Sequence, residues 1–138
     1  MLQRNTAGAL AALWLASCAT LLPDGRAGAL RGPSPEQGDR CQHTPNPLLQ
    51  RSCLRARDKA HAYLASVNQG DALCLDPLLG TDMSNCRART RIEEQDSTAM
   101  QLHLIDVDPG SSWASRANQS IWIENTALID MALREKGF

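Results

Sequence analysis

The side chains best suited to covalent chemistry in this sequence are its five cysteines. Cys18 stands alone near the N-terminus, and the remaining four are Cys41, Cys53, Cys74 and Cys86. An even set of four is typical of two disulfides formed in an oxidising compartment. Four cysteines allow three pairings, and sequence alone does not choose among them. No Cys-x-x-Cys or His-x-x-x-His spacing occurs, so we predict no zinc site and no cofactor.

Two of the conceivable bridges are local, and each would have its own structural effect. A Cys41–Cys53 bridge would join the N-terminal segment to a helix expected after residue 46. A Cys74–Cys86 bridge would brace the loop between those two residues. In the chain-entropy model each such loop contributes about 3 kcal/mol to stability.

Arginine and tryptophan side chains provide two candidate partner surfaces. Arg87, Arg89 and Arg91 alternate with Ala88, Thr90 and Ile92. In an extended strand this alternation places the three arginines on one face. Such a face suits an anionic surface, although an ordinary solvated strand has the same pattern. Trp113 and Arg116 form the second candidate, because Trp and Arg dominate binding hot spots.

The remaining motifs do not predict catalysis. Asp106, Asp108 and Gly110 are spaced like the start of a calcium loop, but Ala117 occupies the position where that loop needs an acid. The sequence contains neither a Gly-x-Ser-x-Gly turn nor a glycine-rich phosphate loop. We therefore predict no catalytic or metal-binding residue and favour a binding protein over an enzyme.

Length and charge limit the class of protein. The chain has 138 residues, which indicates one domain with room for a tail. Its 14 basic and 15 acidic residues give a net charge of −1. A dedicated nucleic-acid-binding protein is usually clearly basic, so we expect no nucleic-acid partner.

The first 18 residues resemble the signal peptide and lipobox of a bacterial lipoprotein precursor. Arg4 supplies positive charge, and residues 7–16 are uncharged and mostly apolar. This run is shorter than the roughly 20 residues that span a bilayer, and it suits a signal peptide. It leads into Leu15-Ala16-Ser17-Cys18, which matches the lipobox.

The resemblance implies a cellular location for the protein. Residues 1–17 would be removed as a signal peptide, and Cys18 would carry a diacylglyceryl group and a further acyl chain such as palmitate. Several acyl chains make anchoring stable where one is marginal. Because Ala19 rather than Asp follows Cys18, the resemblance implies the outer membrane, facing the periplasm. The alternative is secretory cleavage after Ala19, which would release a soluble protein.

The rest of the chain divides into a tether and one domain. Residues 18–45 are rich in Pro and Gly and predict a flexible tether. Residues 46–138 predict a small disulfide-braced α+β domain. Its expected elements are a helix from Asn46-Pro47 to Gly70, a cysteine loop, a hairpin over residues 87–107, and a long C-terminal helix.

The hairpin has a predicted register. If Ile92 lies opposite Met100 and Thr90 lies opposite Leu102, the apolar faces of the two strands coincide. The C-terminal helix is expected to begin after Asp108 or Ser112 and to end before Gly137. Its apolar stripe would include Ile121, Trp122, Leu128, Ile129, Ala132 and Leu133.

These features predict a membrane-anchored envelope lipoprotein acting as a non-enzymatic binding, assembly or inhibitory module. Its partners would be the membrane, through lipid on Cys18, and an envelope protein or glycan. A small envelope hydrolase, or the leading part of one, is the alternative.

Overall fold

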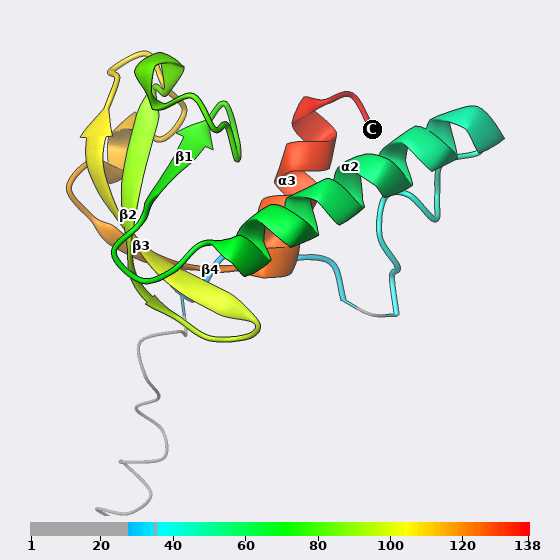
Figure 1. The fold of residues 1–138 in the computed structure, drawn as a ribbon, viewed down its shortest axis with the longest axis horizontal. Helices are drawn as coiled ribbons and strands as arrows, with labels where there is room; N and C mark the ends of the chain where they lie inside the picture. The colour runs from blue at the N-terminus through cyan, green and yellow to red at the C-terminus, as the bar shows by residue number, and fades with distance from the viewer. Residues whose placement is uncertain (1–27, 35) are drawn as a thin grey trace, which may run out of the picture.

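The computed structural model describes residues 28–34 and 36–138. Cys18, the predicted signal peptide and the first part of the predicted tether lie outside the described residues. The described residues fold into a four-stranded antiparallel sheet with two α-helices (Figure 1). The predicted α+β class and the disulfide bracing are therefore confirmed.

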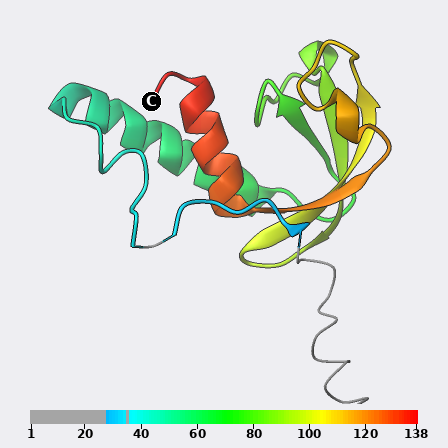
Figure 2. The same cartoon turned by 180° about the vertical axis from the view of Figure 1, so that it is seen from behind.

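Helix α2 spans Pro47–Ser66 and starts at the Asn-Pro pair that predicts it. The Asn46 side chain accepts hydrogen bonds from the backbone N–H groups of Leu48 and Leu49, which satisfies two donors of the first turn. Only Cys53 and Leu64 of this helix are fully buried. Its N-terminal half projects beyond the rest of the domain, as Figures 1 and 2 show from opposite sides.

The sheet is a simple meander in the order β1-β2-β3-β4. The strands are β1 (Ala72–Asp76), β2 (Ala88–Gln95), β3 (Ala99–Val107) and β4 (Ser120–Glu124), and α3 (Asn125–Glu135) follows directly. Short 3₁₀ turns lie at Met83–Asn85 and Ala114–Arg116. One face of the sheet packs against α3 and the C-terminal end of α2, and this core includes Leu64, Leu73, Leu75, Ile92, Met100, Leu102, Leu104, Ile121, Ile123, Leu128 and Leu133.

The hairpin forms, but its predicted register is wrong by two residues. Ile92 lies opposite Leu102 rather than Met100, and Thr90 lies opposite Leu104 rather than Leu102. The turn lies further along the chain than predicted, with Gln95 opposite Met100, and bulges between Ile92 and Glu94 and between Arg89 and Thr90 each shift the pairing again. A shift of two keeps every side chain on its expected face, so the apolar faces still coincide.

The predicted long C-terminal helix is wrong. Ser120–Glu124 forms strand β4, and only Asn125–Glu135 is helical. Ile121 and Ile123 lie opposite Leu102 and Met100 of β3, which buries both isoleucines against the sheet core. Pairing with an existing strand therefore outweighs the helical spacing of these apolar residues.

The predicted cysteine loop also begins later than expected. Cys74 lies within strand β1 and is fully buried, with Leu73 and Leu75 buried on either side. The loop proper starts at Pro77, after a cis Asp76–Pro77 peptide bond. Arg87 N–H then donates to the Asp76 carbonyl at 2.7 Å, which brings the chain back beside β1.

The described part of the predicted tether is attached to the domain. Leu30 forms a parallel bridge with Ile123, donating to the carbonyl of Trp122 at 3.0 Å and accepting from Glu124 N–H at 2.9 Å. Gly32 N–H donates to the Glu124 carboxylate at 2.9 Å. These contacts, which the Pro/Gly-rich composition does not indicate, hold the segment along the outer edge of β4.

Within residues 28–34 and 36–138, no helix combines the length and the apolar character that crossing a bilayer requires.

Candidate functional site

Both local disulfides form. Cys41 is bonded to Cys53, and Cys74 is bonded to Cys86, each pair being 12 residues apart in sequence. The first bridge joins the N-terminal segment to α2, and the second joins β1 to the residues that precede β2. All four cysteines of the described chain are therefore paired.

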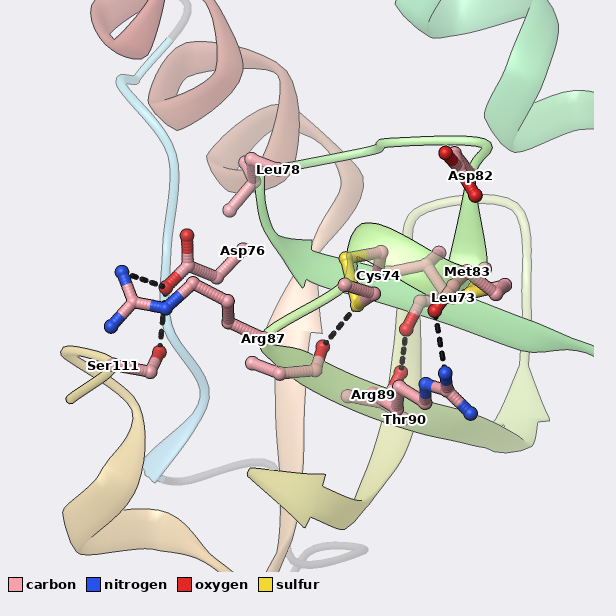
Figure 3. Close-up of a disulfide and its surroundings, with 12 residues drawn as sticks. Leu73, Cys74, Asp76, Leu78, Asp82, Met83, Arg87, Arg89, Thr90 and Ser111 are labelled. Atoms are coloured by element: carbon pink, nitrogen blue, oxygen red, sulfur yellow. Dashed lines mark hydrogen bonds and ion pairs between the residues drawn. A yellow bond between two sulfur atoms is a disulfide. The ribbon is translucent and has the colours of Figure 1, made fainter. Parts of the chain in front are cut away.

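Arg89 and Arg91 alternate with buried residues of β2, and Arg87 precedes the strand, so the predicted arginine face forms in part. The guanidinium of Arg87 lies 4.0 Å from carboxylate oxygens of Asp76 and Asp108. The Arg89 guanidinium donates to the backbone carbonyl of Met83 at 2.6 Å. Figure 3 shows Arg87 and Arg89 directed away from one another near the Cys74–Cys86 disulfide. Of the three, only Arg91 is exposed with no ion pair to a described residue.

The end of the sheet beside Arg87 is a local polar network. Asp76 accepts a hydrogen bond from the buried Ser111 hydroxyl at 2.8 Å, and Figure 3 shows dashed lines joining this carboxylate to both Ser111 and Arg87. Ser111 therefore ties the loop after β3 to the end of β1. The network gives the buried Ser111 hydroxyl an acceptor and places the half-exposed Arg87 guanidinium beside two carboxylates.

The second predicted surface, formed by Trp113 and Arg116, is only partly exposed. Trp113 is half-buried and packs against the core, and Trp122 is buried on strand β4. Arg116 lies in the 3₁₀ turn at Ala114–Arg116 and is partly covered. Neither tryptophan lies on an α-helix, so their expected placement on the C-terminal helix is wrong, whereas the partner surface of Trp113 and Arg116 stays a prediction.

A polar cluster that the sequence does not reveal lies on the face of the sheet that is directed away from the core. It consists of His103, Glu93 and Ser120. His103 Nδ1 is 3.2 Å from the Glu93 carboxylate and 2.9 Å from the Ser120 hydroxyl, which itself donates to Glu93 at 2.8 Å. In a catalytic Ser-His-acid arrangement the hydroxyl and the acid contact different ring nitrogens. Here both contact Nδ1, so the cluster lacks that geometry and fixes the imidazole orientation instead.

A concave site lies between the two helices and the cysteine loop, and we call it the helix–loop groove. Its volume is about 350 Å³, within the range of small-ligand sites. It is lined by Ala56, Lys59, Ala60 and Tyr63 from α2, by residues 77–81 of the loop, and by Ala132, Leu133, Glu135 and Lys136 at the end of α3.

Three contacts hold the loop wall of this groove. The Cys74–Cys86 disulfide closes the loop at its base. Leu79 N–H donates to the Cys74 carbonyl at 2.9 Å. Leu78 N–H donates to the Glu135 carboxylate, at 3.2 and 3.4 Å from its two oxygens, which ties the loop to α3.

The groove combines an apolar lining with a cationic rim. Ala56 and Ala60 are small and leave room beside Leu79 and Leu133. Lys59 and Lys136 both line the groove, and they are the only lysines in the chain. Burial, reinforced by the charge of Asp71, raises the pKa of Tyr63. This phenol therefore stays protonated at neutral pH.

The described residues include no group of three or more His, Cys, Asp or Glu side chains placed to hold a metal ion. No protein-family model matches the chain, and no curated protein or solved structure matches it.

Proposed function

We propose that this chain is a lipid-anchored, non-enzymatic binding protein of the bacterial cell envelope, and that its helix–loop groove holds a partner. The observation that carries the proposal is the cysteine inventory. Four of the five cysteines are paired within the domain, and the fifth, Cys18, stands at the end of the lipobox-like segment. Two structural disulfides are typical of an exported protein, for which lipidation of Cys18 is the expected fate.

The chemistry of the groove favours a protein segment as the partner. Its lining includes three alanine and three leucine side chains, which suit an apolar side chain of a partner. Lys59 and Lys136 at the rim suit an acidic residue beside that apolar anchor. Sugar recognition commonly uses stacked aromatic rings, and Tyr63 is the only aromatic residue in this lining.

The anchor is tested by an intact, non-reduced mass of the protein from a bacterial envelope fraction. We expect a species that begins at lipidated Cys18 and lacks four hydrogens because of two disulfides. The Cys18→Ser variant should lose the lipid. A species beginning after Ala19 without lipid would favour the secreted alternative, and a full-length species with free thiols would contradict export.

The groove is tested by cross-linking in cells. A photoreactive residue placed at Thr81, on the exposed rim, should give one defined protein adduct. The Ala60→Trp variant fills the groove and should abolish that adduct. The matched control is Ala62→Trp, which adds the same ring at an exposed position of α2. An adduct that survives Ala60→Trp would contradict groove binding, and hydrolysis of envelope substrates by the purified protein would favour the enzyme alternative.

A further inference from the structure

One face of α2 carries a row of cations that the fold does not use. Arg51, Arg55 and Lys59 are spaced four residues apart and are all exposed. Residues at this spacing lie above one another on the same side of a helix. Leu48, three residues before Arg51, extends the row to the first turn of the helix.

These cations have no acidic partner among the described residues. The ion pairs of that part of the chain involve Arg40, Arg57, Arg87, Arg134 and His103, and none of the three side chains in the row. Like charges four residues apart destabilise an isolated helix slightly. Residues 47–66 contain four basic residues and one acid, although the whole chain carries −1. The positive charge is therefore concentrated on this helix.

Two leucines at the same end of the helix are exposed to solvent. Leu48 is 73% exposed and Leu49 is 52% exposed. Among the described residues the only other large exposed hydrophobic side chain is Ile105, which lies on β3. The helix end that bears the leucines projects from the domain in Figures 1 and 2.

The projecting helix end is held in place by covalent and polar contacts. The Cys41–Cys53 disulfide attaches α2 to the preceding segment. The Gln50 side-chain amide donates to the Cys41 carbonyl at 3.2 Å, and Asn46 caps the first turn. The leucines are therefore presented on a braced helix, so little ordering is needed when they contact a partner.

We propose that this face of α2 lies on an anionic lipid bilayer. Arg51 and Arg55 contact lipid phosphates, and Leu48 and Leu49 enter the boundary between headgroups and acyl chains, while Lys59 remains at the rim of the helix–loop groove. A basic helix face with an adjoining apolar edge is the arrangement of interfacial helices. A projecting helix end with two exposed leucines beside unpaired cations suits a deformable bilayer better than it suits a rigid acidic protein.

The proposal deepens the function proposed above and rests on it for the presence of a nearby membrane. Stable attachment of a protein to a bilayer usually needs two signals, such as acyl chains and a basic patch. The α2 face supplies the second signal, and it orients the domain so that the sheet is directed away from the membrane-bound helix end.

The experiment uses the processed chain, residues 18–138 with Cys18→Ser, so that no lipid tethers it to vesicles. Its two disulfides are first verified by non-reduced mass. Co-sedimentation is measured with vesicles of phosphatidylcholine alone and of phosphatidylcholine mixed with phosphatidylglycerol. We expect binding only to the mixed vesicles, and we expect that binding to weaken as salt rises, because salt screens the attraction.

Matched variants separate the helix face from general charge. Each basic residue near an anionic surface strengthens binding by about fivefold, so Arg51→Gln with Arg55→Gln should weaken it about thirtyfold. The control is Arg91→Gln with Arg116→Gln, which removes the same charge elsewhere and should leave binding unchanged. Leu48→Ser with Leu49→Ser should also weaken binding, whereas Ile105→Ser should not.

Three results would overturn the proposal. One is equal binding to phosphatidylcholine alone. Another is equal loss of binding in the two arginine double variants. The third is capture of a soluble acidic peptide without vesicle binding, which would assign the face to an acidic protein. Vesicle binding by this chain together with an unlipidated Cys18 in cells would retain the α2 face and reject only the anchor.

Discussion

Thr90 shows how single polar residues are accommodated in this small core. It is 1% exposed in the middle of β2, and its hydroxyl donates to the Leu73 carbonyl on β1 at 2.9 Å. A buried hydroxyl without such a partner would destabilise the fold. The alternation that predicts a strand places Thr90 on the apolar face, and the structure supplies the acceptor that makes this burial acceptable.

Replacing Thr90 tests the value of that hydrogen bond. Thr90→Val keeps the shape of the side chain and removes the hydroxyl, so we expect a loss of about 1 kcal/mol in the free energy of unfolding. The measurement is urea denaturation followed by circular dichroism. Thr81→Val, at an exposed position of the loop, should change stability by less than about 0.5 kcal/mol. Equal effects of both variants would contradict a specific role for the buried hydroxyl.

The ionisation of Asp39 is expected to make the free energy of unfolding depend on pH in the acid range. Burial raises its pKa, but hydrogen bonds from the Arg57 side chain and from the Gln42 backbone N–H outweigh that effect, so the pKa lies below its ordinary value of 3.8. The ionised form is favoured in the folded state. Its contribution to stability is therefore fully present above the unfolded-state value and is lost as pH falls through the lower folded-state pKa.

The corresponding experiment compares Asp39→Asn with the unmodified chain across pH. We expect the variant to be less stable at neutral pH, because it lacks the ion pair with Arg57. We also expect the stability difference between the two proteins to shrink as pH falls below about 4. A constant difference across this range, measured by chemical denaturation, would show that ionisation of Asp39 is not responsible.

At the scale of elements, the sequence predicts structure best where an element exposes one face. The hairpin strands alternate between buried and accessible residues, so their faces are predicted correctly although a bulge changes the register. In β1 and β4 three consecutive residues are buried, and no period of two remains. Short apolar runs of this kind do not distinguish a strand from a helix, which explains the wrong helix over Ser120–Glu124.

The helix–loop groove could not be predicted from the sequence, for a different reason. Its walls come from residues 56–63, 77–81 and 132–136, which approach one another only through the tertiary fold. The chain contains only two lysines, Lys59 and Lys136. The sequence does not show that they lie near one another, and only the fold places both beside the groove.

The segment that leads into the domain can be tested at Gly32. A Cβ at this position would lie 2.7 Å from the backbone nitrogen of Ala127 and 2.6 Å from Cβ of Thr126. Gly32→Ala should therefore push the segment away from α3 and cost about 1–3 kcal/mol. Hydrogen exchange should also increase at Leu30 and Glu124. Gly28→Ala meets no atom within 4 Å and serves as the control, and identical behaviour of the two variants would contradict docking of the segment.

At the scale of the whole molecule, the two disulfides brace the parts of the domain that the core holds least. One bridge holds the projecting half of α2, and the other holds the loop wall of the groove. Each contributes about 3 kcal/mol in the chain-entropy model. A total of about 6 kcal/mol is comparable to the entire stability of many small domains.

Reduction should therefore come close to unfolding the protein. We expect the midpoint of urea denaturation to fall sharply in dithiothreitol, and hydrogen exchange in α2 to rise. The Cys41→Ser with Cys53→Ser variant should lose about half of this stabilisation. Unchanged denaturation after complete reduction, verified by thiol alkylation and mass, would show that the core alone maintains the fold.

Both outer strands of the sheet are partly covered, which limits pairing between the sheets of neighbouring copies. Leu79 folds back to donate to Cys74 beside β1, and Leu30 pairs with Ile123 beside β4, so the chain covers part of both outer strands with its own backbone. Molecules confined to a membrane collide in two dimensions at high local density, where open strand edges favour polymerisation. In the membrane-anchored form proposed above, covering both flanks would let neighbouring copies crowd together without joining their sheets.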